Sequence, residues 1–136
     1  MILRLRSGQI LIELTIALAV AMVAILALVQ SATKSVSSST FSKSQTQATQ
    51  YASEAVEWLR NQKNISWPDF STRISVPTYC LNTLDWNTPA ACTSNMTGLA
   101  FKRQLDISGD NLTVKVIWTE KNKDFSAKQT ISFKEY

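Results

Sequence analysis

Histidine is absent from this chain of 136 residues, and only two cysteines occur in it. Without histidine the chain cannot build a Cys/His zinc site, and it lacks the side chain used most often as a general base. The nucleophile sequence G-x-S-x-G does not occur either. These absences argue against an enzyme. The sequence predicts no catalytic residue, no metal site and no cofactor.

Glycine and proline are also scarce, with three of each, and neither occurs in the fifty-nine residues from Gln9 to Trp67. These two residue types are the strongest helix breakers, so one uninterrupted helix from Gln9 to about Gln62 is expected. Eleven of the twenty-one residues in 30–50 are serine or threonine. Such residues compete for backbone hydrogen bonds, and the order of this stretch within an assembly stays an open question.

The most informative segment is an apolar run from Ile10 to Val29, interrupted only by Glu13 and Thr15. Twenty helical residues span roughly 30 Å, which is the thickness of the hydrocarbon core of a bilayer. A carboxylate in such a segment is costly, by roughly 2.5–3.5 kcal/mol at the midplane and less near the edge. Glu13 is therefore a candidate functional residue that needs a cationic partner.

The charges around this run predict its orientation in a membrane. Arg4 and Arg6 precede the run and no acidic residue does. By the positive-inside rule the first residues stay in the cytoplasm, and the chain beyond about Gln30 lies outside the inner membrane. An ordinary secretory signal peptide is the alternative. Its apolar region usually runs only 7–15 residues, and a glutamate near its start is not expected.

Residues Ser7 to Glu13 read S-G-Q-I-L-I-E and follow a short basic leader. This order of leader, glycine, glutamate and apolar stretch resembles the N-terminus of type IV prepilins and pseudopilins. The resemblance implies that a prepilin peptidase cuts between Gly8 and Gln9, so that residues 1–8 form the leader. Gln9 would become the N-methylated terminus, in a place where phenylalanine or methionine is usual. Glu13 would be the fifth mature residue.

The pilin resemblance also implies a function, which is assembly into a filament. Residues 9–30 would be a membrane helix that later packs in the filament core, where Glu13 meets the terminal amine of a neighbouring subunit. Two opposite charges 4 Å apart attract by about 4 kcal/mol at an effective dielectric constant of 20. The implied partners are other pilin subunits, the prepilin peptidase, an inner-membrane assembly platform with its ATPase, and membrane lipid before assembly.

The expected location follows from the same resemblance. The chain would be a single-pass protein of a bacterial inner membrane, with its head outside the cytoplasm, and would then enter a cell-surface or periplasmic filament. Pili, type II secretion pseudopili and competence filaments all fit, as do major and minor subunits. The competing interpretation is a membrane-anchored binding or adhesion module that does not polymerise.

Cys80 and Cys92 both fall in the part expected to face an oxidising space. A pair in that setting predicts one disulfide, which closes a loop of residues 80–92 and contributes roughly 3 kcal/mol in the loop-entropy account. Their spacing is not C-x-x-C, so a redox or metal-binding pair is disfavoured.

The second half of the predicted helix, residues 31–63, is expected to be amphipathic. Apolar side chains recur at helical spacing and form one stripe, which predicts the seat of a sheet: Phe41, Ala48, Tyr51, Ala52, Ala55, Val56 and Leu59. The neighbouring segment A-S-E-A-V-E-W-L-R weakly resembles a pattern of PilV-type minor pilins and of type II pseudopilin I proteins. A solvated helix face is the expectation for Glu54 and Glu57, with Glu57 and Arg60 forming a surface pair.

Residues 64–136 are expected to form a β-sheet head, beginning where Asn64 and Pro68 end the helix. Alternation of apolar residues predicts four strands: a first at Ile74 and Val76, a second at Leu99, Phe101, Leu105 and Ile107 with its parity broken by Arg103, a third at Leu112, Val114, Val116 and Trp118, and a fourth at Phe125, Ala127, Ile131 and Phe133. The last three form an antiparallel meander. The predicted fold is α+β and pilin-like, with a long N-terminal helix packed on a small antiparallel sheet.

Two features of the head have competing interpretations. Trp86, in the loop 82–98, is either an exposed contact residue for the binding module or a plug over the sheet edge. The net charge is +4, and Lys121, Lys123 and Lys128 are loosely grouped. A solvated hairpin tip is preferred for these lysines, and a DNA-contacting surface is kept as the alternative.

Overall fold

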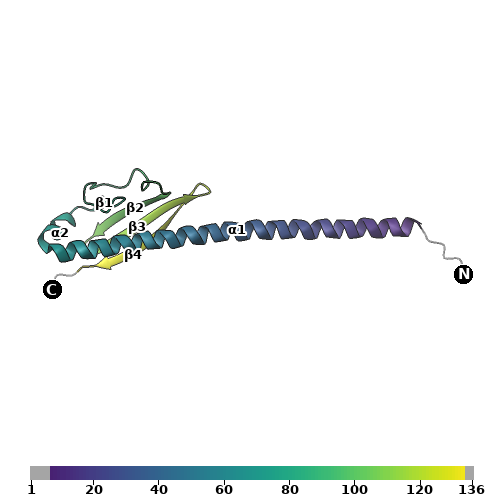
Figure 1. Ribbon diagram of the computed structural model, residues 1–136, viewed down its shortest axis with the longest axis horizontal. Helices are drawn as coiled ribbons and strands as arrows, with labels where there is room; N and C mark the ends of the chain where they lie inside the picture. The colour runs from purple at the N-terminus through teal and green to yellow at the C-terminus, as the bar shows by residue number, and fades with distance from the viewer. Residues whose placement is uncertain (1–6, 134–136) are drawn as a thin grey trace. The chain divides into compact units, whose positions relative to one another are not determined.

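A computed structural model of the chain describes residues 7–133 (Figure 1). The elements in order are α1 (Ser7–Ile65), α2 (Trp67–Arg73), β1 (Thr78–Cys80), β2 (Phe101–Ser108), β3 (Asn111–Glu120) and β4 (Lys123–Ser132). The chain divides into two compact units, one ending at Thr40 and the other beginning at Phe41. The prediction of an α+β fold with a long N-terminal helix and an antiparallel sheet is confirmed.

The first unit is helical throughout its described part. Its hydroxyl side chains bond to the helix itself: Thr33 donates to the carbonyls of Val29 and Gln30, and Thr40 donates to that of Val36. These bonds satisfy the polar side chains without ending the helix, because the backbone hydrogen bonds are kept alongside them. The serine- and threonine-rich stretch is therefore helical here despite its low propensity.

In the second unit the C-terminal part of α1 packs on one face of the sheet, as Figure 1 shows. The predicted stripe is confirmed as core, since Ala48, Ala52, Ala55 and Leu59 are all fully buried. Alanine at three of these positions lets the helix backbone approach the sheet closely. The sheet, with Leu81 just after β1, contributes a matching apolar face: Tyr79, Phe101, Leu105, Leu112, Val114, Val116 and Trp118.

The four strands pair in the order β1-β2-β3-β4, and every pairing is antiparallel. Two tight turns set the register. Gly109 opens the β2–β3 turn with φ +57°, while Lys121 and Asn122 in the β3–β4 turn have φ 50° and 61°. Positive φ at both central residues is the type I′ arrangement that matches the twist of paired strands. The predicted meander is confirmed, although β2 begins at Phe101, after Leu99.

The segment between the long helix and the sheet differs from the prediction. The helix ends at Ile65, and a second helix, α2, follows it; Ile74 and Val76, expected in a strand, lie in the turn after α2. The Ser66 hydroxyl accepts a hydrogen bond from the Asp69 amide, and Pro68 lies in the first turn of α2. Serine at the N-cap with proline in the first turn is a helix-start signal, so Pro68 belongs to the start of a helix here. The first strand follows Pro77 instead.

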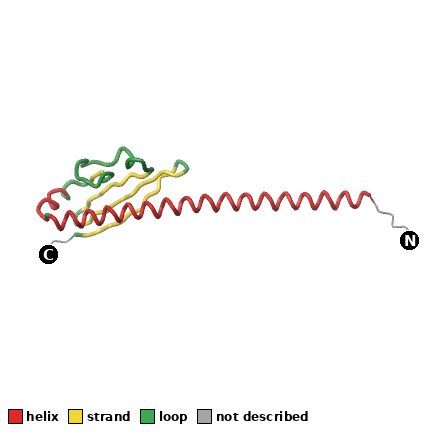
Figure 2. Tube along the Cα trace, viewed as in Figure 1, coloured by secondary structure: helices red, strands yellow, loops and turns green. Residues whose placement is uncertain are grey.

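A long connection links β1 to β2 and is drawn in green in Figure 2. The disulfide between Cys80 and Cys92 closes part of it, as predicted, with the two Cα atoms 4.8 Å apart. The Cys80 amide donates to the Thr88 carbonyl and the Leu81 amide to the Arg103 carbonyl, at 3.0 and 2.8 Å. The connection is therefore anchored both to itself and to β2, although it contains no regular element.

Candidate functional site

The N-terminal candidate site lies within α1, in the first unit. The helix begins at Ser7, so the Gly8–Gln9 peptide bond lies in helical backbone, while residues 1–6 of the expected leader lie outside the described residues. Gln9 and Glu13 are four residues apart, which places them on the same side of the helix one turn from each other.

Glu13 is exposed, and none of the three ion pairs found among residues 7–133 includes it. The other polar interruption is satisfied locally, because the Thr15 hydroxyl donates to the Ile12 carbonyl at 2.8 Å. Glu13 is thus the ionisable residue of the apolar run, and within residues 7–133 no ion pair compensates its charge.

The side chains around Glu13 form an exposed apolar surface. The large ones between Ile10 and Val29 are 54–71% exposed. By length and composition this part of α1 can cross a membrane. An apolar surface of this extent needs cover from lipid or from other helices. Small residues interrupt it, and Ala19, Ala24 and Ala27 line a shallow apolar hollow with Val20 and Val23. With Ala17 and Ala21, they allow another helix to approach closely.

In the second unit, the most heavily bonded side chain is that of Arg103 on β2, a residue that is buried in the core. Its guanidinium donates to the Leu81 carbonyl at 2.9 Å, to the Tyr51 carbonyl at 3.2 Å and to the Glu54 carboxylate at 2.7 Å. The Asn82 side chain accepts from the backbone amide of Arg103 at 2.9 Å. One side chain therefore ties α1, β2 and the start of the disulfide loop together.

Arg103, which breaks the apolar parity of β2, occupies the inward face of the strand, because its charge is matched by carbonyls and a carboxylate. The arrangement also corrects one expectation. Glu54 does not belong to a purely solvated face, since it pairs with Arg103, whereas the expected surface pair of Glu57 and Arg60 is present at 2.7 Å. A lone charged residue at an inward strand position was the sequence signal for a buried pair, and the partner could not be read from spacing.

Trp86 is half-buried and packs as a plug, which decides between the two interpretations of this residue. Its ring centroid is 4.9 Å from those of Trp58 and Tyr79, and its indole N–H donates to the Gln62 side chain at 3.3 Å. The Arg73 guanidinium lies 5.8 Å from the centre of the same ring. The ring thus spans from α1 to β1, and this packing removes the main argument for Trp86 as an exposed contact residue.

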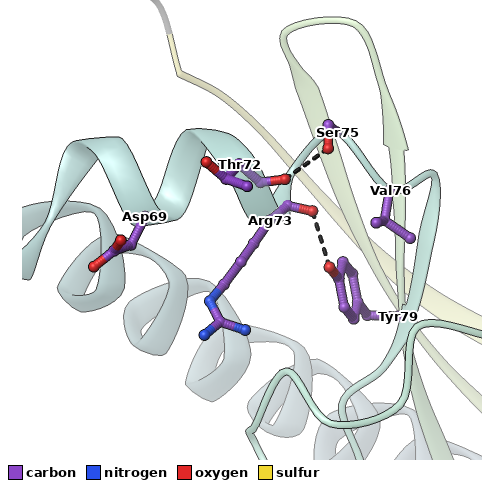
Figure 3. Close-up of a pocket in the computed structure, with 6 residues that line it drawn as sticks. All are labelled: Asp69, Thr72, Arg73, Ser75, Val76 and Tyr79. Carbon is purple, nitrogen blue, oxygen red and sulfur yellow. Dashed lines mark hydrogen bonds between the residues drawn. The ribbon is translucent and has the colours of Figure 1, made fainter.

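Beside this cluster, an open hollow of about 450 Å³ is lined by Asp69, Thr72, Arg73, Ser75, Val76 and Tyr79 (Figure 3). Its hydroxyls are already committed: Tyr79 donates to the Arg73 carbonyl and Ser75 to the Thr72 carbonyl, as the dashed lines show. The Thr72 hydroxyl likewise donates to the Pro68 carbonyl, so each of these hydroxyls is bonded to a backbone carbonyl. Among residues 7–133, no group of three or more Asp, Glu or Cys side chains could hold a metal ion.

Two aspartates of the head have lowered pKa values. The Thr83 hydroxyl and the Asn87 amide bond to the Asp85 carboxylate, and these bonds lower its pKa. For Asp106 partial burial acts to raise the pKa, but hydrogen bonds from Gln104, Lys115 and Thr78 and the charge of Lys115 outweigh it, so that the pKa is lowered. Lys115 and Asp106 are 3.0 Å apart on the outer face of the sheet.

The three lysines singled out in the sequence do not form one patch. Lys121 lies in the β3–β4 turn and Lys123 begins β4, so both belong to the hairpin tip as expected. Lys128 lies five residues further along the edge strand.

No family model matches the chain, and comparison with curated proteins and with solved structures gives no match either.

Proposed function

We propose that this chain is a structural subunit, a minor pilin or pseudopilin, of a type IV pilus-like filament. The observation that carries the proposal is the N-terminal segment, in which an exposed apolar helix bears one carboxylate four residues after Gln9. An α+β head with an antiparallel sheet on the same helix supports a pilin-like layout. The function is assembly, without chemical turnover.

In the proposed mechanism, prepilin peptidase cuts the bond between Gly8 and Gln9. The new amine is positive and stands at a helix N-terminus, where the helix dipole disfavours a cation. The negative charge of Glu13 compensates both the amine and the positive end of the helix dipole. The burial of Glu13 in an apolar surrounding also costs less free energy once it is paired. Pairing between neighbouring subunits would fix their axial register, while the alanine-containing apolar surfaces pack together.

Mass spectrometry of purified filaments tests this proposal directly. The expected result is that the chain is present and begins at Gln9, with or without a methyl group on the amine. A chain that keeps residues 1–8 in the filament, or one that begins near residue 33 after ordinary signal peptidase cleavage, would reject the proposal.

Glu13→Gln separates the filament subunit from the membrane-anchored module. The substitution keeps the size of the side chain and removes its charge, so incorporation into filaments should fail while insertion in the membrane is kept. Thr15→Val is the matched control in the same segment and should assemble normally. Equal incorporation of Glu13→Gln and the unaltered chain would favour a simple anchor.

A further inference from the structure

Strand β4 forms one edge of the sheet, and its free side has the properties of a pairing site. It lies at the end of the strand order and pairs with β3 over its full ten residues without a bulge. It contains no proline or glycine. Edge strands of this length and regularity are templates for a further strand, and a charged side chain on the edge disfavours strands that do not carry the opposite charge.

The register identifies which backbone groups are free. In a hairpin with a two-residue turn, the flanking pair Glu120 and Lys123 is hydrogen-bonded, and this pattern repeats at every second residue. The backbone amides and carbonyls of the odd-numbered residues of β4 therefore point toward β3. The bond from the Phe133 amide to the Asp110 carbonyl at 3.2 Å agrees with this pattern. The amides and carbonyls of the even-numbered residues point to the free side, and all five are exposed: 124, 126, 128, 130 and 132.

The charge along this side selects the partner. Lys128 stands opposite Lys115 in the register, a like-charged pair that is unfavourable across strands. Lys115 forms an ion pair with Asp106 of β2 at 3.0 Å, on the side away from β4. None of the three ion pairs among residues 7–133 includes Lys128. A strand added beside β4 with a carboxylate opposite Lys128 would supply the charge that the sheet itself does not.

We propose that the free edge of β4 docks an extended segment of a second protein that carries an acidic residue opposite Lys128. A second copy of this chain is disfavoured as the occupant. Antiparallel pairing of two β4 strands through all five even-numbered residues from 124 to 132 would place Lys128 against its own copy. The inference stands on the head alone and does not depend on the proposed filament function.

The test uses the full chain in detergent micelles and two synthetic strand peptides of about ten residues. Both peptides alternate valine and threonine, and they differ in a central glutamate or lysine. The glutamate peptide should bind the unaltered chain about fivefold more tightly than the lysine peptide, and Lys128→Glu should reverse this preference. Amide hydrogen exchange should show new protection at the even-numbered residues 124–132 only.

Thr130→Pro is the control for backbone pairing. Its amide points to the free side, so proline should leave the β3–β4 ladder intact but abolish peptide binding. Circular dichroism checks that the variant stays folded, and Ser126→Pro serves as a second variant if it does not. Absence of protection at the even-numbered amides, an unchanged preference in Lys128→Glu, or a concentration-dependent dimer that protects these amides without peptide would overturn the proposal.

Discussion

Arg103 and Glu54 form an ion pair of 2.7 Å in which the arginine side chain is 4% exposed and the glutamate 55%. The pair joins β2 to α1 across forty-nine residues of sequence. The arginine is buried and is held in place by further hydrogen bonds to the backbone carbonyls of Leu81 and Tyr51. The glutamate lies at the surface and accepts one of the guanidinium hydrogen bonds.

Loss of Arg103 should destabilise the head strongly. Arg103→Met leaves the carbonyls of Leu81 and Tyr51 short of a donor in a buried place, and we expect a loss of about 2–3 kcal/mol in the free energy of unfolding. Glu54→Gln should cost about 1 kcal/mol, because solvent partly screens the exposed partner. Urea unfolding followed by circular dichroism measures both.

Glu57→Gln is the control for this pair, because Glu57 and Arg60 form a surface pair with side chains 69% and 54% exposed. Its expected cost is under about 0.5 kcal/mol. Equal losses for the two glutamate variants would mean that the bond between Arg103 and Glu54 adds nothing to stability.

The disulfide should contribute measurably to the stability of the head. Replacing Cys80 and Cys92 with serine opens a loop whose ends are twelve residues apart, and we expect a loss of roughly 3 kcal/mol. A reducing agent should destabilise the unaltered chain by a similar amount and leave the double variant unchanged. Thermal unfolding with and without the reductant measures the effect, and an equal melting temperature in both conditions would contradict it.

Acid should weaken the outer face of the sheet through Asp106. The pKa of this carboxylate is lower in the folded chain than its unfolded value of about 3.9, so its stabilising contribution is present above that value. It is lost as the pH falls from there through the lower folded pKa. Asp106→Asn should remove this part of the acid dependence when melting temperatures are recorded from pH 7 to pH 2.

Lys115→Met tests the cause, because it removes both a hydrogen bond and the neighbouring charge. The acid dependence due to Asp106 should then shrink. If the difference between the unaltered chain and Asp106→Asn has the same pH profile with methionine at position 115, the lysine does not set this pKa.

The β2–β3 turn requires a residue that tolerates positive φ at Gly109. A Cβ at this position would meet nothing within 4 Å, so the effect of a substitution is purely conformational. Gly109→Ala should cost about 1 kcal/mol, and Gly109→Asn should cost less because asparagine enters this region more readily. Unfolding free energies of the two variants decide the matter, and an unchanged stability of Gly109→Ala would contradict the conformational argument.

Periodic and local features of the chain could be predicted from the sequence alone. The stripe from Phe41 to Leu59 and the alternation from Leu112 to Trp118 follow directly from helix and strand geometry, and the structure confirms both. Glu13 also stands out in the sequence, because a charge in an apolar run is visible without any fold. The start of α2 was within reach too, because Ser66 and Pro68 are a local signal that the alternation of Ile74 and Val76 outweighed.

The partners of isolated residues were decided only in the tertiary structure. Arg103 broke the apolar parity of its strand, but its spacing gives no indication of Glu54 or of the Leu81 carbonyl. Trp86 lies in a connection without periodicity. Its packing depends on Trp58 of α1, a helix that ends at Ile65, far from Trp86 in the sequence. Periodicity records which face of an element is buried, because that is a property of one segment. A bond between segments depends on how the chain returns on itself, and only the folded head determines that.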